Sequence, residues 1–407
     1  MNISKPEVVV ITGASAGIGR ATAHAFAKEG AHIGLVARSR DALEAARQEV
    51  EEMGGKGLVI PADVSDSDQV EKAAATVEET FGPIDVWVNN AMASILSPFM
   101  EIKLEDFKRC TEVTYLGYVY GTMSALRRMK PRDKGTIVQV GSGLAHRSIP
   151  LQSAYCGAKA AIRGFTDSLR SELFHDNSNV HITMVQLPAV NTPQFDWIEN
   201  NMPKKPQPVP PIFQPEVAAD AIVWSAHHKR RELYVGGSTV KAIMANKVAP
   251  GLLDCYLAQS GYTSQQTDEP EKPQRDSNLW QPGGDRGTHG RFDDRAQDSS
   301  IQLEATKHQN LLALAAGAGM AALAVGTYLG YSAQPKQSNG RRQEEDKMSE
   351  SNIGSGVVRK LQQEFQKGNK IDQFHLMMGL ARWGWKALSG NSQKRSEEQQ
   401  PLPNASR

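Results

Sequence analysis

The sequence predicts an α/β fold with a doubly wound, parallel, seven-stranded sheet, followed by a largely disordered or helical C-terminal extension. Three observations lead to this fold class. Short apolar runs alternate with segments of helical length up to about residue 251, and these runs are apolar on both faces, as buried parallel strands are. Residues 260–300 are instead rich in Asp, Gln, Pro, Gly and Arg, a composition that favours no core.

The alternation assigns the elements in order. Strands are expected over residues 8–11, 33–37, 58–62, 86–89, 137–140, 182–187 and 233–235. Helices are expected over residues 18–29, 41–53, 67–80, 104–129, 154–175 and 216–226. Because such sheets bind ligands beyond the carboxyl ends of their strands, the chemistry is expected there.

Composition excludes several classes. Among 407 residues, 46 Lys and Arg balance 45 Asp and Glu, so no global charge attracts nucleic acid. The three Cys form no CxxC pair and the ten His show no ligand spacing, so we expect neither a disulfide framework nor a metal site. No secretory signal precedes the first strand, so we expect the catalytic domain in the cytoplasm.

A glycine-rich run lies between the first strand and the first helix. In this position backbone N–H groups and the positive helix end can face a pyrophosphate, and glycine leaves room for its approach. The run therefore predicts a dinucleotide site formed by Thr12, Gly13, Ser15, Ala16, Gly17, Ile18 and Gly19.

Residues 12–19 resemble the TGxxxGIG element of the short-chain dehydrogenase/reductase family, and the resemblance covers roughly residues 8–237. It implies a Rossmann-type fold, a small-molecule substrate and a homo-oligomer, either dimer or tetramer. It also implies that Asp63 and Val64 contact the adenine. The family's NNAG element corresponds to Asn89, Asn90 and Ala91, with Met92 where Gly is usual.

The end of the second strand selects the nucleotide. An acidic residue there would bind the free 2′-hydroxyl of NAD, whereas Arg38 and Arg40 offer positive charge to a 2′-phosphate. We therefore expect NADP(H) rather than NAD(H). The alternative is that both arginines only solvate the start of a helix.

Tyr155 and Lys159 lie four residues apart, which places them on one face of a helix. A neighbouring cation favours the phenolate, so Lys159 would bring the pKa of Tyr155 toward a useful range. Ser142 precedes Tyr155 by the family's usual interval. The resemblance implies that Tyr155 is the general acid/base, that Ser142 binds the substrate oxygen, and that Lys159 also binds the nicotinamide ribose.

Two positions depart from the family pattern. Thr114 stands where the family has a catalytic Asn, and a hydroxyl is expected not to offer the amide's donor and acceptor together, which would alter the proton relay behind Lys159. After the sixth strand, Pro188 is followed by Ala189 rather than Gly, while Val190 and Thr192 match the positions that anchor the nicotinamide carboxamide.

Residues 194–214 are Pro-rich and are expected to cover the substrate pocket as a loop. Its large apolar side chains either line the pocket or pack the loop onto the domain, and these are Phe195, Trp197, Ile198 and Phe213.

The chain therefore divides into an NADP(H)-binding catalytic domain (1–255), a polar linker (256–310), a hydrophobic helix (311–331) and a polar tail (332–407). The uncharged run 311–331 is long enough to span or anchor in a membrane, and a soluble hydrophobic helix is the alternative. An apolar, Trp-containing segment at 357–388 is compatible with an interfacial helix, a partner helix or a helix folded back on the domain.

These features favour an NADP(H)-dependent oxidoreductase that interconverts a lipophilic ketone or aldehyde and an alcohol. A nucleotide-binding regulatory or scaffold protein is the first alternative, with Thr114 as a mark of weakened catalysis. A sugar epimerase is the second, although its glycine loop is usually spaced differently.

Overall fold

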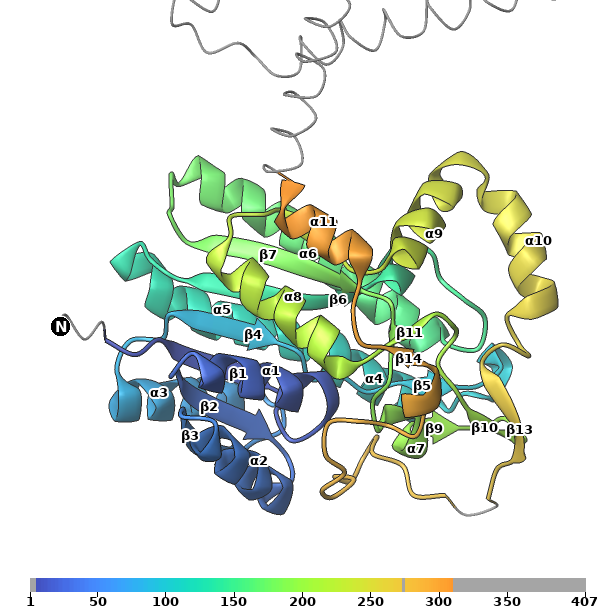
Figure 1. The fold of residues 1–407 in the computed structure, drawn as a ribbon, viewed down its shortest axis with the longest axis horizontal. Helices are drawn as coiled ribbons and strands as arrows, with labels where there is room; N and C mark the ends of the chain where they lie inside the picture. Colours follow the sequence, from blue (N-terminus) through green and yellow to red (C-terminus); the bar gives the residue numbers. More distant parts are fainter. Residues whose placement is uncertain (1–4, 273–274, 310–407) are drawn as a thin grey trace, which may run out of the picture. The chain divides into compact units, whose positions relative to one another are not determined.

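The computed structural model describes residues 5–272 and 275–309. The seven expected strands form one parallel sheet with the order β12-β7-β6-β4-β1-β2-β3 (Figure 1). The direction of winding reverses between β1 and β4, which opens a crevice at their carboxyl ends. The predicted fold class is confirmed. The strands are β1 (Val8–Thr12), β2 (His32–Ala37), β3 (Lys56–Pro61), β4 (Val86–Asn89), β6 (Thr136–Ser142), β7 (His181–Leu187) and β12 (Glu232–Tyr234).

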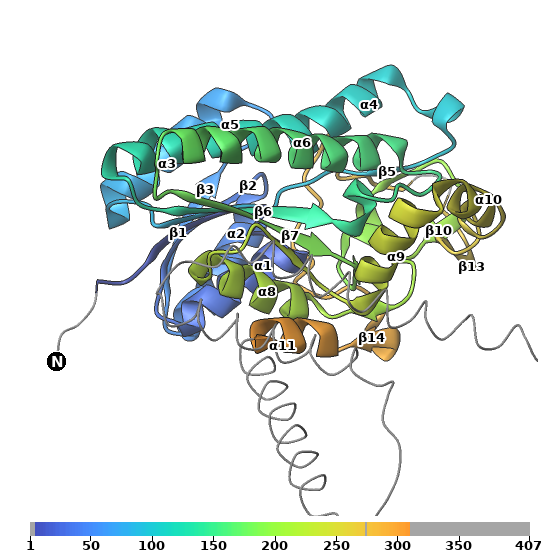
Figure 2. The same cartoon turned by 90° about the horizontal axis from the view of Figure 1, so that it is seen from above.

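Helices cover both faces of the sheet (Figure 2). Side chains of β1 alternate between two hydrophobic clusters, because successive residues of a strand point to opposite faces. One face carries α1 (Gly17–Lys28), α2 (Arg40–Glu52), α8 (Pro215–His227) and α11 (Ile301–Lys307). The other carries α3 (Ser67–Phe81), α4 (Leu104–Thr111), α5 (Gly117–Met129) and α6 (Ser153–His175).

Polar caps set where α2 and α3 begin. The Ser39 hydroxyl accepts from the backbone N–H of Ala42 at 3.4 Å, and the Asp66 carboxylate accepts from that of Asp68 at 2.9 Å. The caps leave Arg38 and Asp63 on short loops directly after β2 and β3, where they face the crevice.

The helix expected over 104–129 is interrupted. A π-helical turn, Glu112–Leu116, separates α4 from α5. Gly117 is the next residue, and its backbone packs closely against the loop after β3. A Cβ at this position would lie 2.9 Å from a methyl carbon of Val64. Such π turns are frequent at functional sites, and this one contains Thr114.

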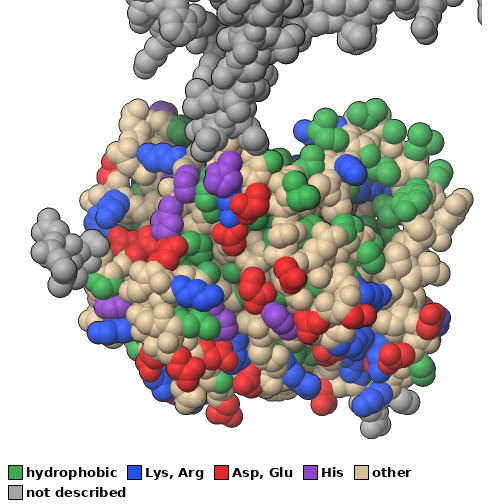
Figure 3. Space-filling view, in the orientation of Figure 1, with side chains coloured by type: hydrophobic (Ala, Val, Ile, Leu, Met, Phe, Trp, Pro, Cys, Tyr) green, Lys and Arg blue, Asp and Glu red, His purple; other side chains and the backbone are tan. Residues whose placement is uncertain are grey.

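Short elements lie beyond the carboxyl ends of the strands. They are β5 (Ile95–Leu96), β8 (Ala189–Val190), α7 (Gln194–Trp197), β9 (Glu199–Asn200), β10 (Lys204–Pro206), β11 (Ile212–Phe213), α9 (Gly237–Val248), α10 (Pro250–Ser260), β13 (Gln266–Pro270) and β14 (Ala296–Gln297). Apolar side chains gather at the surface of α9 and α10 (Figure 3), where Val248 is 80% and Leu252 is 74% exposed.

The region expected as a polar linker packs along the catalytic domain instead. β13 pairs with β10 and β14 pairs with β11. Leu279, Phe292 and Leu303 are each at most 3% exposed. Composition did not reveal this packing because a few separated apolar side chains hold the segment while its polar side chains remain in solvent. We call residues 275–292 the strap.

The predicted hydrophobic helix at 311–331 and the tail at 332–407, with its segment 357–388, lie outside the described residues. Within residues 5–272 and 275–309, no helix has both the length and the apolar character that crossing a membrane requires.

Candidate active site

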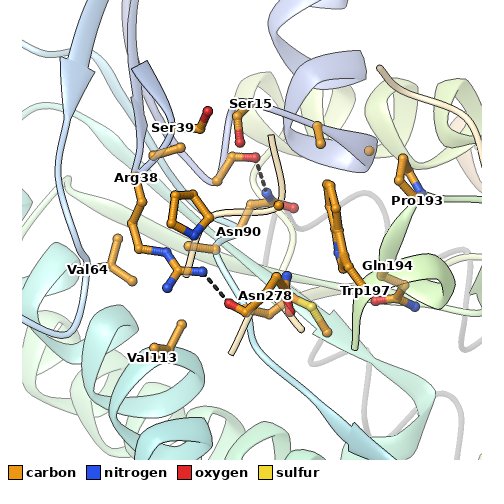
Figure 4. Close-up of a pocket in the computed structure, with 18 of the residues that line it drawn as sticks. Ser15, Arg38, Ser39, Val64, Asn90, Val113, Pro193, Gln194, Trp197 and Asn278 are labelled. Carbon is orange, nitrogen blue, oxygen red and sulfur yellow. Dashed lines mark hydrogen bonds between the residues drawn. The ribbon is translucent and has the colours of Figure 1, made fainter. Parts of the chain in front are cut away.

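The residues predicted to hold the nucleotide converge on a cleft beyond the carboxyl ends of the strands (Figure 4). The cleft has a volume of about 160 Å³. Of the predicted set, its walls include Gly13, Ser15, Ala16, Gly17, Ile18, Arg38, Asp63, Val64, Asn90, Ala91 and Thr192. The other predicted nucleotide contacts lie outside these walls, and they are Thr12, Gly19, Arg40, Asn89, Tyr155, Lys159 and Val190.

The glycine-rich loop has the backbone geometry that a phosphate site requires. Gly13 and Gly17 have φ values of +69° and +54°, in the left-handed region that favours glycine. A Cβ at Gly19 would lie 2.2 Å from the carbonyl oxygen of Gly13, so the loop and the first turn of α1 pack in direct contact. The first N–H groups of α1 therefore border the cleft, as an anion site at a helix N-terminus needs.

Two of the residues predicted to contact the nucleotide form hydrogen bonds within the protein that hold neighbouring loops in place. The Thr12 hydroxyl accepts from the backbone N–H groups of Asn90 at 2.9 Å and Ala91 at 3.1 Å, which joins the loops after β1 and β4. Asn89 is fully buried, and its amide donates to the Gln139 side chain at 3.0 Å. Thr12 and Asn89 thus position Asn90 and Ala91, which do line the cleft.

The two arginines predicted at the 2′-phosphate differ in position. Arg38 lines the cleft, whereas Arg40 is exposed as the first residue of α2. Burial lowers the pKa of Arg38, and the nearby Asp63 carboxylate partly offsets that effect. Asp63 accepts from Arg109 Nη2 at 2.5 Å; although burial raises the pKa of Asp63, this contact and Ser65 hold it below its usual value.

The predicted catalytic side chains come from the end of β6 and the first turns of α6. Ser142 ends β6, and Tyr155 and Lys159 project from α6. Lys159 Nζ donates to the carbonyl oxygen of Val140 at 2.7 Å and lies 5.6 Å from the centroid of the Tyr155 ring. The Ser142 hydroxyl accepts from the backbone N–H of Leu144 at 3.1 Å.

Burial dominates the electrostatics of this group. It lowers the pKa of Lys159 to about 7 and raises the pKa of Tyr155 above its usual value, an increase that the Ser142 hydroxyl partly offsets. At neutral pH the Tyr155 phenol is protonated and can donate, while Lys159 is poised between its charged and neutral forms.

Tyr118 belongs to this group, although sequence reasoning did not find it. Its side chain is 1% exposed, its hydroxyl donates to the Val140 carbonyl oxygen at 2.9 Å, and it accepts from Lys159 Nζ at 2.9 Å. The contact joins α5 to α6, so it depends on tertiary packing. The local sequence offers only a tyrosine in a helix one turn after Thr114.

Thr114 does supply both a donor and an acceptor, so the expectation that a hydroxyl could not do so is wrong. Its hydroxyl accepts from the backbone N–H of Ala93 at 2.9 Å and donates to the carbonyl oxygen of the same residue at 2.8 Å. Thr114 is fully buried. It therefore fixes the loop after β4 against the π-helical turn.

The loop after β7 is held by backbone pairing. Val190 is buried and pairs with Phe213 in a small sheet, while Thr192 lines the cleft. Between them, Asn191 was not predicted from the sequence; its amide donates to Gln214 at 3.0 Å and to Asp293 at 2.8 Å. This pairing stiffens the segment that follows Pro188.

The large apolar side chains of the 194–214 loop take different positions. Trp197 lines the cleft. Phe195, Ile198 and Phe213 are at most 8% exposed, and the Phe195 ring packs edge-on against Phe292 with centroids 5.8 Å apart. These three side chains pack the loop against the rest of the domain.

The cleft can hold a dinucleotide phosphate chain, and the group formed by Ser142, Tyr155 and Lys159 can protonate a carbonyl oxygen.

The family profile described as short chain dehydrogenase matches residues 7–202. An uncharacterized oxidoreductase, YxnA of Bacillus subtilis, is 34% identical over 79% of this chain and 90% of its own length. A fatty acyl-CoA reductase of Acinetobacter baylyi is 32% identical over 54% of this chain and 73% of its own. A solved short-chain dehydrogenase from Streptomyces avermitilis has a TM-score of 0.54 and 26% identity, covering 63% of this chain and 95% of its own.

Proposed function

Because the chain belongs to the short-chain dehydrogenase/reductase family, and is thus an NAD(P)-dependent oxidoreductase acting on CH–OH groups, we propose that it interconverts a lipophilic ketone or aldehyde and an alcohol with NADP(H). Tyr155 acts as the general acid/base. The observation that carries the proposal is the buried group of Ser142, Tyr155 and Lys159, in which a protonated phenol lies beside an ammonium of lowered pKa.

NADPH, when bound, supplies the hydride that reduces the carbonyl carbon. The Tyr155 phenol gives its proton to the carbonyl oxygen, and the Ser142 hydroxyl holds that oxygen in place. The charged form of Lys159 stabilises the phenolate that remains, because opposite charges attract strongly in a buried site. In the oxidation direction the same groups return the proton.

The preference for NADP(H) rests on Arg38. Its guanidinium lines the cleft beside Ser39, and no acidic residue lies between 37 and 40. A planar guanidinium binds phosphate through paired hydrogen bonds, which a free ribose hydroxyl cannot exploit. Asp63 and Val64 line the same end of the cleft, where the adenine would lie.

A lipophilic substrate is supported by the fatty acyl-CoA reductase among the relatives. The regulatory or scaffold alternative relied on Thr114. The Thr114 hydroxyl bridges both backbone groups of Ala93, so Thr114 has a structural role in the loop after β4, and the assay below separates the two functions. The homo-oligomer, membrane association through 311–331 and a cytoplasmic location remain predictions.

The test assays the full chain against ketones and aldehydes of increasing chain length, with NADPH and with NADH. We expect NADPH oxidation that depends on the carbonyl compound, higher kcat/KM for long chains, and a preference for NADPH. NADPH binding without turnover across the whole panel would favour the regulatory alternative. Preference for NADH would overturn the role given to Arg38.

A further inference from the structure

The strap lies across the nucleotide cleft. Asn278, Pro282, Gly283 and Gly284 line the cleft together with residues of the glycine-rich loop. Figure 1 shows this part of the chain on the side of the sheet to which the carboxyl ends of the strands point, and Figure 4 shows Asn278 directly beside Arg38.

Backbone carbonyl oxygens of the strap accept hydrogen bonds from the Arg38 guanidinium. Arg38 Nη2 donates to the carbonyl oxygen of Asn278, and Nη1 donates to those of Trp280 at 3.0 Å and Leu279 at 3.4 Å. These N–H groups are the ones that a phosphate would engage, because a guanidinium has a fixed set of five donors in one plane. Carbonyl oxygens of the strap and a 2′-phosphate therefore compete for the same atoms.

The strap also fills the adenine end of the cleft. Leu279 is fully buried in the hydrophobic cluster that contains Val64 and Val113, and both of those residues line the cleft. Its carbonyl oxygen accepts from Arg109 Nε at 3.1 Å, and the same guanidinium binds Asp63. Asp63, the residue that resemblance assigns to adenine, is thus engaged within the chain.

A third contact lies at the phosphate end. The carbonyl oxygen of Gly287 accepts from the backbone N–H of Gly17 at 3.0 Å, at the start of α1. The Asp285 carboxylate accepts from Arg20 Nη1 at 2.5 Å. The strap therefore places a carbonyl dipole and a negative charge beside the helix end that favours anions.

Little space remains in the part of the cleft that the strap borders. With the strap in this position the cleft has a volume of about 160 Å³, against ~300–1,000 Å³ for typical small-molecule sites. Beyond the cleft, the strap is held independently, because the backbone N–H of Phe292 donates to Asn191 Oδ1 at 3.1 Å and the Phe292 ring is buried. The contacts that hold Phe292 are therefore separate from those that Asn278 and Leu279 make with Arg38.

We propose that the strap is an intramolecular ligand of the nucleotide site, which competes with the 2′-phosphoadenosine half of NADP(H) for Arg38 and the slot filled by Leu279. The inference rests on the proposed function, because it requires that this cleft bind NADP(H). It assigns to the C-terminal region a control over cofactor affinity.

Leu279→Ser tests the proposal, since a polar side chain weakens the buried anchor without touching the cofactor residues. We expect the Kd for NADPH, measured by quenching of protein fluorescence on the full chain, to fall at least about tenfold, as for a ligand freed from a competing state. The Kd for NADH should fall by a similar factor, because NADH also needs the slot that Leu279 fills. The matched control is Leu303→Ser on α11, because Leu303 is also a buried leucine of the C-terminal region, 1% exposed. The Kd of this control variant for NADPH should equal that of the wild type.

An unchanged or raised Kd for NADPH in a folded Leu279→Ser chain would overturn the proposal, and a raised Kd would identify the strap as a clamp over bound cofactor. Hydrogen exchange of the wild-type chain gives a second test that needs no variant. The backbone N–H of Asn278 donates to the Trp197 carbonyl oxygen at 2.8 Å, so NADPH should accelerate exchange in a peptide spanning 276–287. Slower exchange there contradicts displacement. Absence of NADPH binding in both chains would overturn the proposed function itself.

Discussion

Lys159 and Tyr118 form a buried pair in which the ammonium donates to the phenol oxygen at 2.9 Å. The phenol in turn donates to the Val140 carbonyl oxygen, which also accepts from Lys159. Tyr118 thus supplies one of the two acceptors that hold the ammonium beside Tyr155. The pair gives Tyr118 a positioning role that acts through Lys159.

Tyr118→Phe should shift the pH profile of carbonyl reduction. Reduction needs charged Lys159, whose pKa is about 7, so activity should be present below that pH and decline as pH rises through it. Removing an acceptor of the ammonium destabilises the charged form, so the decline should move to lower pH. The measurement is kcat between about pH 5.5 and 9. Tyr120→Phe, on the same helix, is the control, and identical profiles for wild type and Tyr118→Phe would exclude the positioning role.

Lys159→Met should give an inactive but more stable chain. The pKa of Lys159 is about 7 when folded and near 10.5 when unfolded, so the unfolded chain binds the proton more tightly and burial of the charge destabilises the fold. This penalty is full below about pH 7 and disappears as pH rises toward 10.5. The Tm gain of the variant should be about 3 °C or more at pH 6 and should shrink at pH 10. A gain independent of pH would contradict burial of the charge.

Thr114→Val should destabilise the fold through the loop after β4. The substitution preserves shape but leaves the buried N–H of Ala93 without its acceptor, at a cost of about 1–3 kcal/mol. Urea unfolding measures the loss. Thr114→Ser keeps the hydroxyl and should retain most of the stability and activity. A loss in Thr114→Ser with none in Thr114→Val would show that the methyl group, not the bridge to Ala93, matters.

Arg38→Ala should reduce the preference for NADPH over NADH. The substitution removes charge-assisted hydrogen bonds to the 2′-phosphate, so the ratio of kcat/KM values should fall by about tenfold or more. Arg40→Ala is the matched control, because Arg40 lies outside the walls of the cleft. An equal fall in both variants would show that net charge, not contact at Arg38, selects the nucleotide.

Features encoded by neighbouring residues were predictable. The apolar runs predicted the seven strands, the glycine spacing predicted the tight loop between β1 and α1, and the four-residue spacing of Tyr155 and Lys159 placed both on one face of α6. Features created by packing were not. Tyr118 reaches Lys159 from another helix, and the strap is held by Leu279 and Phe292, single apolar residues whose burial no local pattern reveals.

The helix expected over 104–129 illustrates the same limit within one element. Its helical residues were predicted correctly, but the π-helical turn at Glu112–Leu116 was not. The turn is stabilised by the bridge from Thr114 to Ala93, two residues that are 21 positions apart. Sequence periodicity detects the helix and cannot detect such a contact.

The proposed reaction depends on Tyr155 as the group that provides the proton during hydride transfer. The most direct measurement follows the absorbance of the reduced nicotinamide for the full-length wild type, Tyr155→Phe, and a control variant, Tyr256→Phe, whose tyrosine is 63% exposed on α10. All three should bind NADPH with similar Kd, and only Tyr155→Phe should lose carbonyl-dependent oxidation, by about a thousandfold. Turnover by Tyr155→Phe within tenfold of the wild type would show that another group provides the proton.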